Sequence, residues 1–260
     1  MNASATRMQQ AARLRGAALA QLWTVRGHWR LPVPRAVMRR ERDGLIAELM
    51  PAVLVIGVMV GTLLFAVLPN SLGSAYFSAL GSLWPVWVVY GAPIAAAQML
   101  AMHRAPTLAL ELTQRQARGE FAVLARAQSS PAGLPCISFL VAHAIAVAAV
   151  GFLMIGLTLA AGLVAALVLG AQDIRFMVDA VFSLVSPLDW LRSLVTSLVL
   201  GLACSLAAML YAWPGSRVSA AGVDAHRLGL RAMMISSLAV ILCTFVLNWL
   251  TGVLGFLKWW

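Results

Sequence analysis

The sequence has few charged residues, and acidic residues are especially scarce. Asp, Glu, Lys and Arg make up only 11% of its 260 residues, with 9 acidic against 19 basic. Water-soluble domains carry about 25% charged and about 45–50% apolar residues, whereas 62% of this chain is hydrophobic. This composition argues against an ordinary soluble domain. It also excludes a disordered chain, because disordered chains have too few apolar residues to form a core.

Cysteine is scarce too, and the familiar catalytic motifs are absent. Cys136, Cys204 and Cys243 lie far apart in apolar runs, without the spacing of a disulfide framework or a metal site. The sequence contains no H-E-x-x-H pattern, no G-x-S-x-G elbow and no P-loop. We therefore expect no catalytic residues, no metal site and no cofactor. His143 is the one histidine deep in an apolar run, and a hydrogen-bonded histidine inside a helix bundle is its expected role.

Long intervals without charge predict an all-α membrane protein with five spans, each needing about 20 apolar residues. Leu49–His103 has no charged residue and is divided after Pro69 by a cluster of turn residues, giving spans near 49–69 and 84–103. Three more spans are predicted near 138–170, 193–216 and 232–257. The third is either one tilted helix or a hairpin of two short helices. We expect one helix, because no proline or polar cluster divides Phe139 from Leu169.

The basic residues predict the orientation of the chain. Residues 1–50 have nine arginines and three acidic residues, a net charge of +6, and the loops 104–126 and 217–231 are each +2. The loop 70–83 is uncharged and the loop 173–192 is −1. Because cytoplasmic loops carry the excess of Arg and Lys, we expect the N-terminus in the cytoplasm and the C-terminus outside. The net charge of +10 then reflects topology and contact with lipid headgroups, and no nucleic-acid partner is expected.

The segment 1–48 predicts a cytoplasmic, interfacial N-terminal region ahead of a five-span domain at 49–257. Apolar residues recur at steps of three and four from Ala11 to Trp29, with most arginines off that stripe. This pattern is typical of an amphipathic helix lying on the membrane. Pro32 and Pro34 are expected to end it. An organelle transit peptide, also rich in Arg and poor in acidic residues, is the alternative.

The segment 104–131 is the main candidate for contact with a partner. Between Pro106 and Pro131 the spacing of Leu108, Leu112 and Phe121 predicts a short cytoplasmic helix between spans two and three. A solvated connecting loop is the alternative. The predicted spans contain no charged residues that could couple transport to ions, so any transport is expected to draw its energy from a partner.

Two stretches resemble the MlaE (YrbE-type) permease family. The first runs from Tyr90-Gly91-Ala92-Pro93 to Pro131. In an alignment without gaps, Pro93 coincides with the proline of the family's Glu-Leu-Gly-Pro turn. Glu111 coincides with the glutamate of its Ala-Glu step, and Pro131 with the last proline of its coupling segment. The second stretch is similar to the family's final loop and last span, and it comprises Ser219-Ala220-Ala221-Gly222-Val223, Ser236-Ser237-Leu238-Ala239-Val240 and Phe245-Val246-Leu247.

Five positions depart from the family pattern. Val89 and Tyr90 stand where the family has Arg-Glu, and His103 stands at its corner arginine, with Arg104 one place later. Gly119 stands at the coupling glutamate, with Glu120 beside it, and Thr244 at an acidic position of the last span. These losses of charge mark a diverged member and keep a second hypothesis open, a non-transporting assembly or scaffold subunit.

The resemblance implies a homodimeric permease of an ABC-type phospholipid transporter in the bacterial inner membrane. Its partners would be a cytosolic ATPase and a periplasmic MCE-type lipid-binding protein, with ATP hydrolysis performed by the partner. The residues expected to dock the ATPase are Glu111, Arg115, Arg118, Glu120 and Phe121. Tyr90 and His103 are the candidates for the lipid path. A lipid-modifying enzyme is disfavoured, because the sequence shows no clustered polar catalytic groups.

Overall fold

The computed structural model describes residues 32–120, 123, 134–168, 174–212 and 225–257. Within these ranges every regular element is helical and no strand occurs. Five helical stretches are long and apolar enough to cross a membrane, which confirms the all-helical, five-span fold. They are Arg35–Leu72, Tyr76–Ala117, Ile137–Val168, Pro187–Ala212 and His226–Thr251. The amphipathic helix expected before Pro32 lies outside the described residues.

The first span begins well before the residue at which the uncharged interval starts. α2 (Pro32–Thr62) passes without a break through residue 48, continues as the π-helix η2 (Leu63–Val67) and ends with α3 (Leu68–Leu72). The basic segment ahead of residue 49 is therefore the first part of the spanning helix. Pro51 lies inside it. Proline removes one backbone hydrogen bond, a loss that neighbouring helices and local adjustments compensate in membrane helices.

The turn-rich cluster after Pro69 extends the helix, where a loop over 70–83 was expected. Asn70 Nδ2 donates to the carbonyl of Ala66 at 2.9 Å, and Ser71 Oγ donates to that of Val67 at 2.9 Å. Because these side chains bond back onto the preceding turn, they do not break it. The chain reverses only at Gly73, whose φ of 52° favours glycine. The 3₁₀-helix η3 (Gly73–Ala75) then leads into α4 (Tyr76–Val86).

The second span continues as the π-helix η4 (Trp87–Gly91) and α5 (Ala92–Ala117), so the first part of the predicted coupling segment 104–131 is continuous with the spanning helix. Most of its part after residue 120 lies outside the described residues. Pro106, expected to begin the coupling helix, lies inside α5. Thr107 Oγ1 donates to the carbonyl of Arg104 at 2.9 Å, close to the site of the missing amide. α5 ends just before Gly119, whose φ of 73° is typical of a glycine that terminates a helix.

The third span is one helix, α7 (Leu134–Val168), as expected. Its 35 residues extend about 52 Å at about 1.5 Å per residue, so it must tilt or project beyond a hydrocarbon core of about 30 Å. A short helix that the sequence did not predict, α8 (Ile174–Ser183), follows it. The last two spans are α9 (Pro187–Ala212) and α10 (Ala225–Leu257).

Small residues let the helices approach closely. α2 packs most extensively on α7, while α9 contacts α5, α7 and α10. A Cβ at Gly61 of α2 would overlap the carbonyl oxygen of Thr158 and lie 2.9 Å from the backbone nitrogen of Gly162, both on α7. Gly57 and Gly61 thus form a G-x-x-x-G face of the kind that brings membrane helices together.

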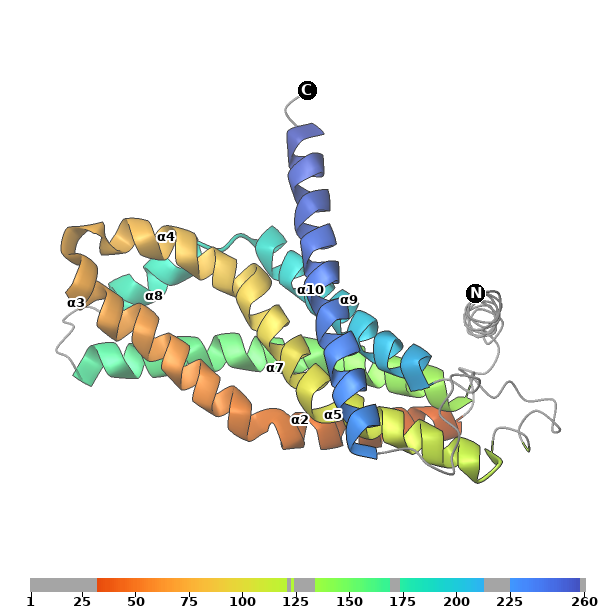
Figure 1. Ribbon diagram of the computed structural model, residues 1–260. Coiled ribbons are helices and arrows are strands. Elements are labelled where there is room, and N and C mark those ends of the chain that lie inside the picture. Colours follow the sequence, from red (N-terminus) through yellow and green to blue (C-terminus); the bar gives the residue numbers. More distant parts are fainter. Residues whose placement is uncertain (1–31, 121–122, 124–133, 169–173, 213–224, 258–260) are drawn as a thin grey trace.

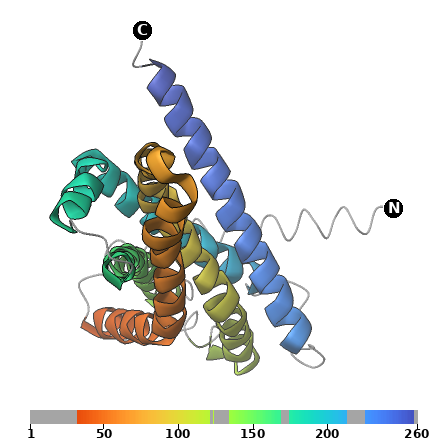
Figure 2. The same ribbon diagram turned by 90° about the vertical axis from the view of Figure 1, so that its left-hand side faces the viewer.

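α10 is the most exposed span. It crosses the other helices steeply, and its C-terminal end projects beyond them (Figures 1 and 2). Only 17% of its apolar window is buried, against 50% for the second, third and fourth spans. Large apolar side chains such as Ile241, Phe245 and Trp249 are exposed along it. α10 therefore presents an apolar surface that suits lipid or another protein.

We expect the change Gly61→Val to destabilise the fold by about 3 kcal/mol, at the upper end of overpacking costs, because its side chain meets the backbone of α7. The free energy of unfolding in mixed detergent micelles measures this. Gly156→Ala on α7 is the matched control, since a Cβ there meets nothing within 4 Å. Equal stability of Gly61→Val and the unaltered chain would contradict the α2–α7 packing.

Candidate functional site

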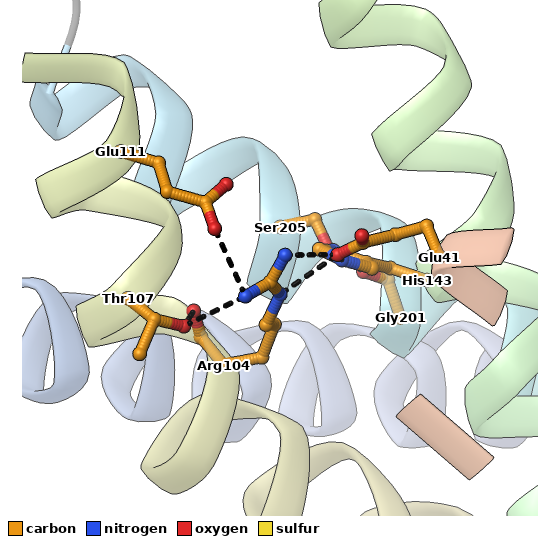
Figure 3. Close-up of polar contacts among 7 residues, drawn as sticks. All are labelled: Glu41, Arg104, Thr107, Glu111, His143, Gly201 and Ser205. Carbon is orange, nitrogen blue, oxygen red and sulfur yellow. Dashed lines mark hydrogen bonds and ion pairs between the residues drawn. The ribbon is translucent and has the colours of Figure 1, made fainter. Parts of the chain in front are cut away.

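Four helices contribute side chains to one polar cluster (Figure 3). It brings together charged and polar groups that lie up to 164 positions apart in the sequence. Most of them come from α2 and α5, with one side chain from each of α7 and α9. The cluster residues are Glu41, Arg104, Thr107, Glu111, His143 and Ser205.

The centre of the cluster is the ion pair between Arg104 of α5 and Glu41 of α2. Arg104 Nε donates to Glu41 Oε1 at 2.7 Å, and Nη2 donates to the same oxygen. The two side chains are 15% and 17% exposed. Leu45 and Leu108, one helical turn away on α2 and α5, are buried in apolar cores. A guanidinium cannot lose its charge in a protein, so in this place it requires a carboxylate partner.

A second carboxylate shares the same guanidinium. Arg104 Nη1 lies 3.3 Å from Glu111 Oε1 and 3.2 Å from Thr107 Oγ1. Glu111 is two turns further along α5, and its side chain is 39% exposed. The cluster therefore reaches from a part-buried carboxylate on α2 to a half-exposed one further along α5.

The other arm of the cluster passes through His143 to α9. His143 Nε2 lies 3.5 Å from Glu41 Oε1, and its Nδ1 lies 2.7 Å from Ser205 Oγ. Ser205 Oγ donates its hydroxyl proton to the backbone carbonyl of Gly201 at 2.9 Å, so its oxygen can accept a hydrogen bond from Nδ1–H of His143. His143 is only 1% exposed. The expectation of a hydrogen-bonded histidine inside the bundle is confirmed.

The residues expected to dock an ATPase lie around the end of α5. Glu111 joins the buried cluster, while the Arg115 guanidinium lies over the ring of Phe139, 5.6 Å from its centre. Arg118 is exposed and Glu120 is half-exposed, and their side chains lie 3.9 Å apart, beyond that end of the helix. Phe121 lies outside the described residues.

The two lipid-path candidates are not brought together with the cluster. Tyr90 lies in the π-helix η4 and is half-buried, and His103 is exposed on α5 immediately before Arg104. From the sequence, Glu41 and Arg104 were topology signals, and Arg104 was also the residue one place after the family's corner arginine, but the two were not paired. The available signal was that Glu41 precedes the first predicted span and Arg104, of opposite charge, follows the second.

The polar cluster connects side chains of α2, α5, α7 and α9. Among the described residues, no group of three or more His, Cys, Asp and Glu side chains could hold a metal ion. Each charged group in the cluster faces a partner on another helix or on its own. Its direct physical consequence is to join α2, α7 and α9 to the middle of α5, at Arg104.

Comparison with known proteins gives one family. The family model described as permease MlaE matches residues 40–250. This range includes every residue of the cluster and all five candidate spans, except the first residues of span one and the last residue of span five. No curated protein matches the chain significantly.

We expect the single changes Glu41→Gln and Arg104→Gln each to destabilise the chain by about 3 kcal/mol, because each leaves the other partner of a largely buried pair uncompensated. The double change should cost clearly less than the sum of the two. A double-mutant cycle in the free energy of unfolding measures the difference. The control is Arg42→Gln, whose ion pair with Asp43 is exposed and contributes at most about 1 kcal/mol. Additive costs at Glu41 and Arg104 would contradict the pairing.

Proposed function

The chain belongs to the MlaE permease family, and we propose on that premise that it is a phospholipid permease subunit driven by a cytosolic ATPase. The observation that carries the proposal is the family match over residues 40–250 together with five membrane-spanning helices. The chain is a multi-pass membrane protein of a transport family. Coupling to an ATPase, the orientation in the membrane and the oligomeric state are the parts that we add.

The proposed contact surface for the ATPase is the end of α5. Three charged side chains at this end, Arg115, Arg118 and Glu120, lie on the last turns of the helix or just beyond them. α5 is continuous through Pro106, so a displacement at this end can move the helix as a rigid body. The excess of arginine in the segments on this side supports its placement in the cytoplasm.

The proposed location is the bacterial inner membrane, with an MCE-type lipid-binding protein on the periplasmic side. The apolar helices suit acyl chains. Tyr90 is proposed to face the lipid path because η4 is a π-helix, an irregularity that is frequent at functional sites. His103 is the second candidate, an exposed side chain on the same spanning helix.

A second candidate function is that of a non-transporting assembly subunit of such a complex. The supporting observation is the loss of charge where the family has Arg-Glu, since Val89 is 5% exposed and Tyr90 is half-buried. An ATPase whose hydrolysis rate depends on the chain would support the permease, and a bound but unaffected ATPase would support the assembly subunit.

Charge reversal at the end of α5 tests the coupling surface. We expect Arg118→Glu combined with Glu120→Lys to reduce co-purification of the ATPase about tenfold, because a reversed charge repels the matching group of the partner. The control is Arg175→Glu combined with Asp179→Lys on α8, where both side chains are exposed. Unchanged co-purification in the α5 variant would refute this surface.

The proposed homodimer follows from the family and from the exposed apolar face of α10. We expect native mass spectrometry from detergent to give the mass of two chains of 27.7 kDa each. We also expect the variant Phe245→Cys to form an oxidative cross-link between two chains that lack the native cysteines. Phe245 is 72% exposed. Leu54→Cys, on the exposed side of α2, is the control that should not cross-link. A mass of one chain under all detergent conditions would contradict the dimer.

A further inference from the structure

Among the residues around the end of α5, Glu111 differs from its neighbours because it also belongs to the buried cluster. Arg104 divides its donors between two carboxylates. Nε and Nη2 face Glu41, and Nη1 faces Glu111 and Thr107. The ATPase surface and the interior of the bundle therefore share one side chain.

The two carboxylates are held unequally. The Nε–Oε1 distance to Glu41 is 2.7 Å, whereas the Nη1–Oε1 distance to Glu111 is 3.3 Å. Glu41 is 17% exposed and Glu111 is 39% exposed. Because a more exposed and longer ion pair is weaker, Glu111 is the partner that an external cation can remove.

Among the described residues of α5, no arginine other than Arg104 forms an ion pair with Glu111. Arg115 is one turn further along the helix, at the spacing that favours an ion pair with Glu111. Its guanidinium instead lies over the ring of Phe139 on α7. Glu111 thus stands between Arg104, on the inner side, and the end of the helix that is proposed to meet the ATPase.

We propose that Glu111 exchanges between Arg104 and a basic side chain of the ATPase, and that this exchange resets the Arg104–Glu41 pair joining α5 to α2, α7 and α9. The proposal rests on the proposed function. With Glu111 in place, one guanidinium is shared by two carboxylates. When a basic group of the partner takes Glu111, Arg104 is left to Glu41 alone, and their attraction is no longer divided. Glu41 carries the change to His143 and, through its ring, to Ser205.

This gives the cluster two arrangements that a partner can select between, which is the physical requirement for coupling distant sites. Arg104 and Glu41 act as positioning residues, because neither is proposed to touch the lipid or the ATPase. Their loss should uncouple two quantities that are linked in the unaltered protein, the ATP hydrolysed and the lipid moved.

The experiment uses the full chain reconstituted with its ATPase in vesicles of phosphatidylethanolamine and phosphatidylglycerol. It measures ATPase binding, the hydrolysis rate and the fluorescent phosphatidylethanolamine moved per ATP. We expect Glu41→Gln, which removes no proposed contact with the ATPase, to keep ATP hydrolysis within about twofold. For Glu111→Gln, which removes a proposed contact, the readout is the ratio of lipid moved to ATP hydrolysed. The lipid moved per ATP should fall about fivefold or more, which is the lower range of allosteric coupling. The exchanged pair Glu41→Arg with Arg104→Glu should recover part of that ratio.

The matched control is Glu48→Gln, an exposed glutamate on α2 outside the cluster, which should transport like the unaltered chain. Should the unaltered chain fail to bind an ATPase, the proposed function is wrong and this inference with it. If it binds and transports, but Glu41→Gln and Glu111→Gln move as much lipid per ATP as Glu48→Gln does, only the inference is overturned. If Glu41→Gln does not fold, Glu111→Gln alone tests the inference, because the side chain at position 111 is more exposed and its change should disturb folding less.

Discussion

The structure depends on how one permanent positive charge is accommodated among apolar helices. Arg104 cannot be neutralised by losing its proton, and a charge with no partner inside a membrane bundle is costly. Glu41 supplies the partner from α2, and His143 holds the same carboxylate from α7. Because these contacts must form together, the ion pair fixes the relative positions of helices that are otherwise held by apolar packing.

The need to pair Arg104 also places the cluster between the proposed ATPase surface on α5 and the other helices of the bundle. α5 carries Arg104 near its middle and the proposed ATPase surface at its end, with Glu111 between them. The G-x-x-x-G face of α2 holds that helix against α7. A short chain of polar contacts connects Glu111 and Arg104 of α5 with Glu41 of α2 and His143 of α7. α10 lies largely outside this network and keeps its apolar face for lipid or for another copy of the chain.

The sequence predicts the number and identity of the spans because the uncharged intervals are long and the cost of buried charge is large. It misplaces the ends of helices, since Asn70 and Ser71 bond back onto the preceding turn and Pro106 is tolerated inside α5. It could not find the cluster. Glu41 and Arg104 are 63 positions apart, and only the packing of α2 against α5 and α7 shows that they meet. For His143, the apolar run around it indicated burial, but not its partner Ser205.

The central claim is that this diverged permease still moves lipid with energy from ATP. The most direct measurement reconstitutes the unaltered chain with its ATPase and MCE-type partner. It follows the transfer of radiolabelled phospholipid between the vesicle membrane and the MCE-type protein, with ATP and with a non-hydrolysable analogue. The account predicts transfer that requires hydrolysis and disappears when the permease is omitted. Equal transfer with ATP and with the analogue, from a complex that assembles normally, would contradict it and would favour an assembly subunit.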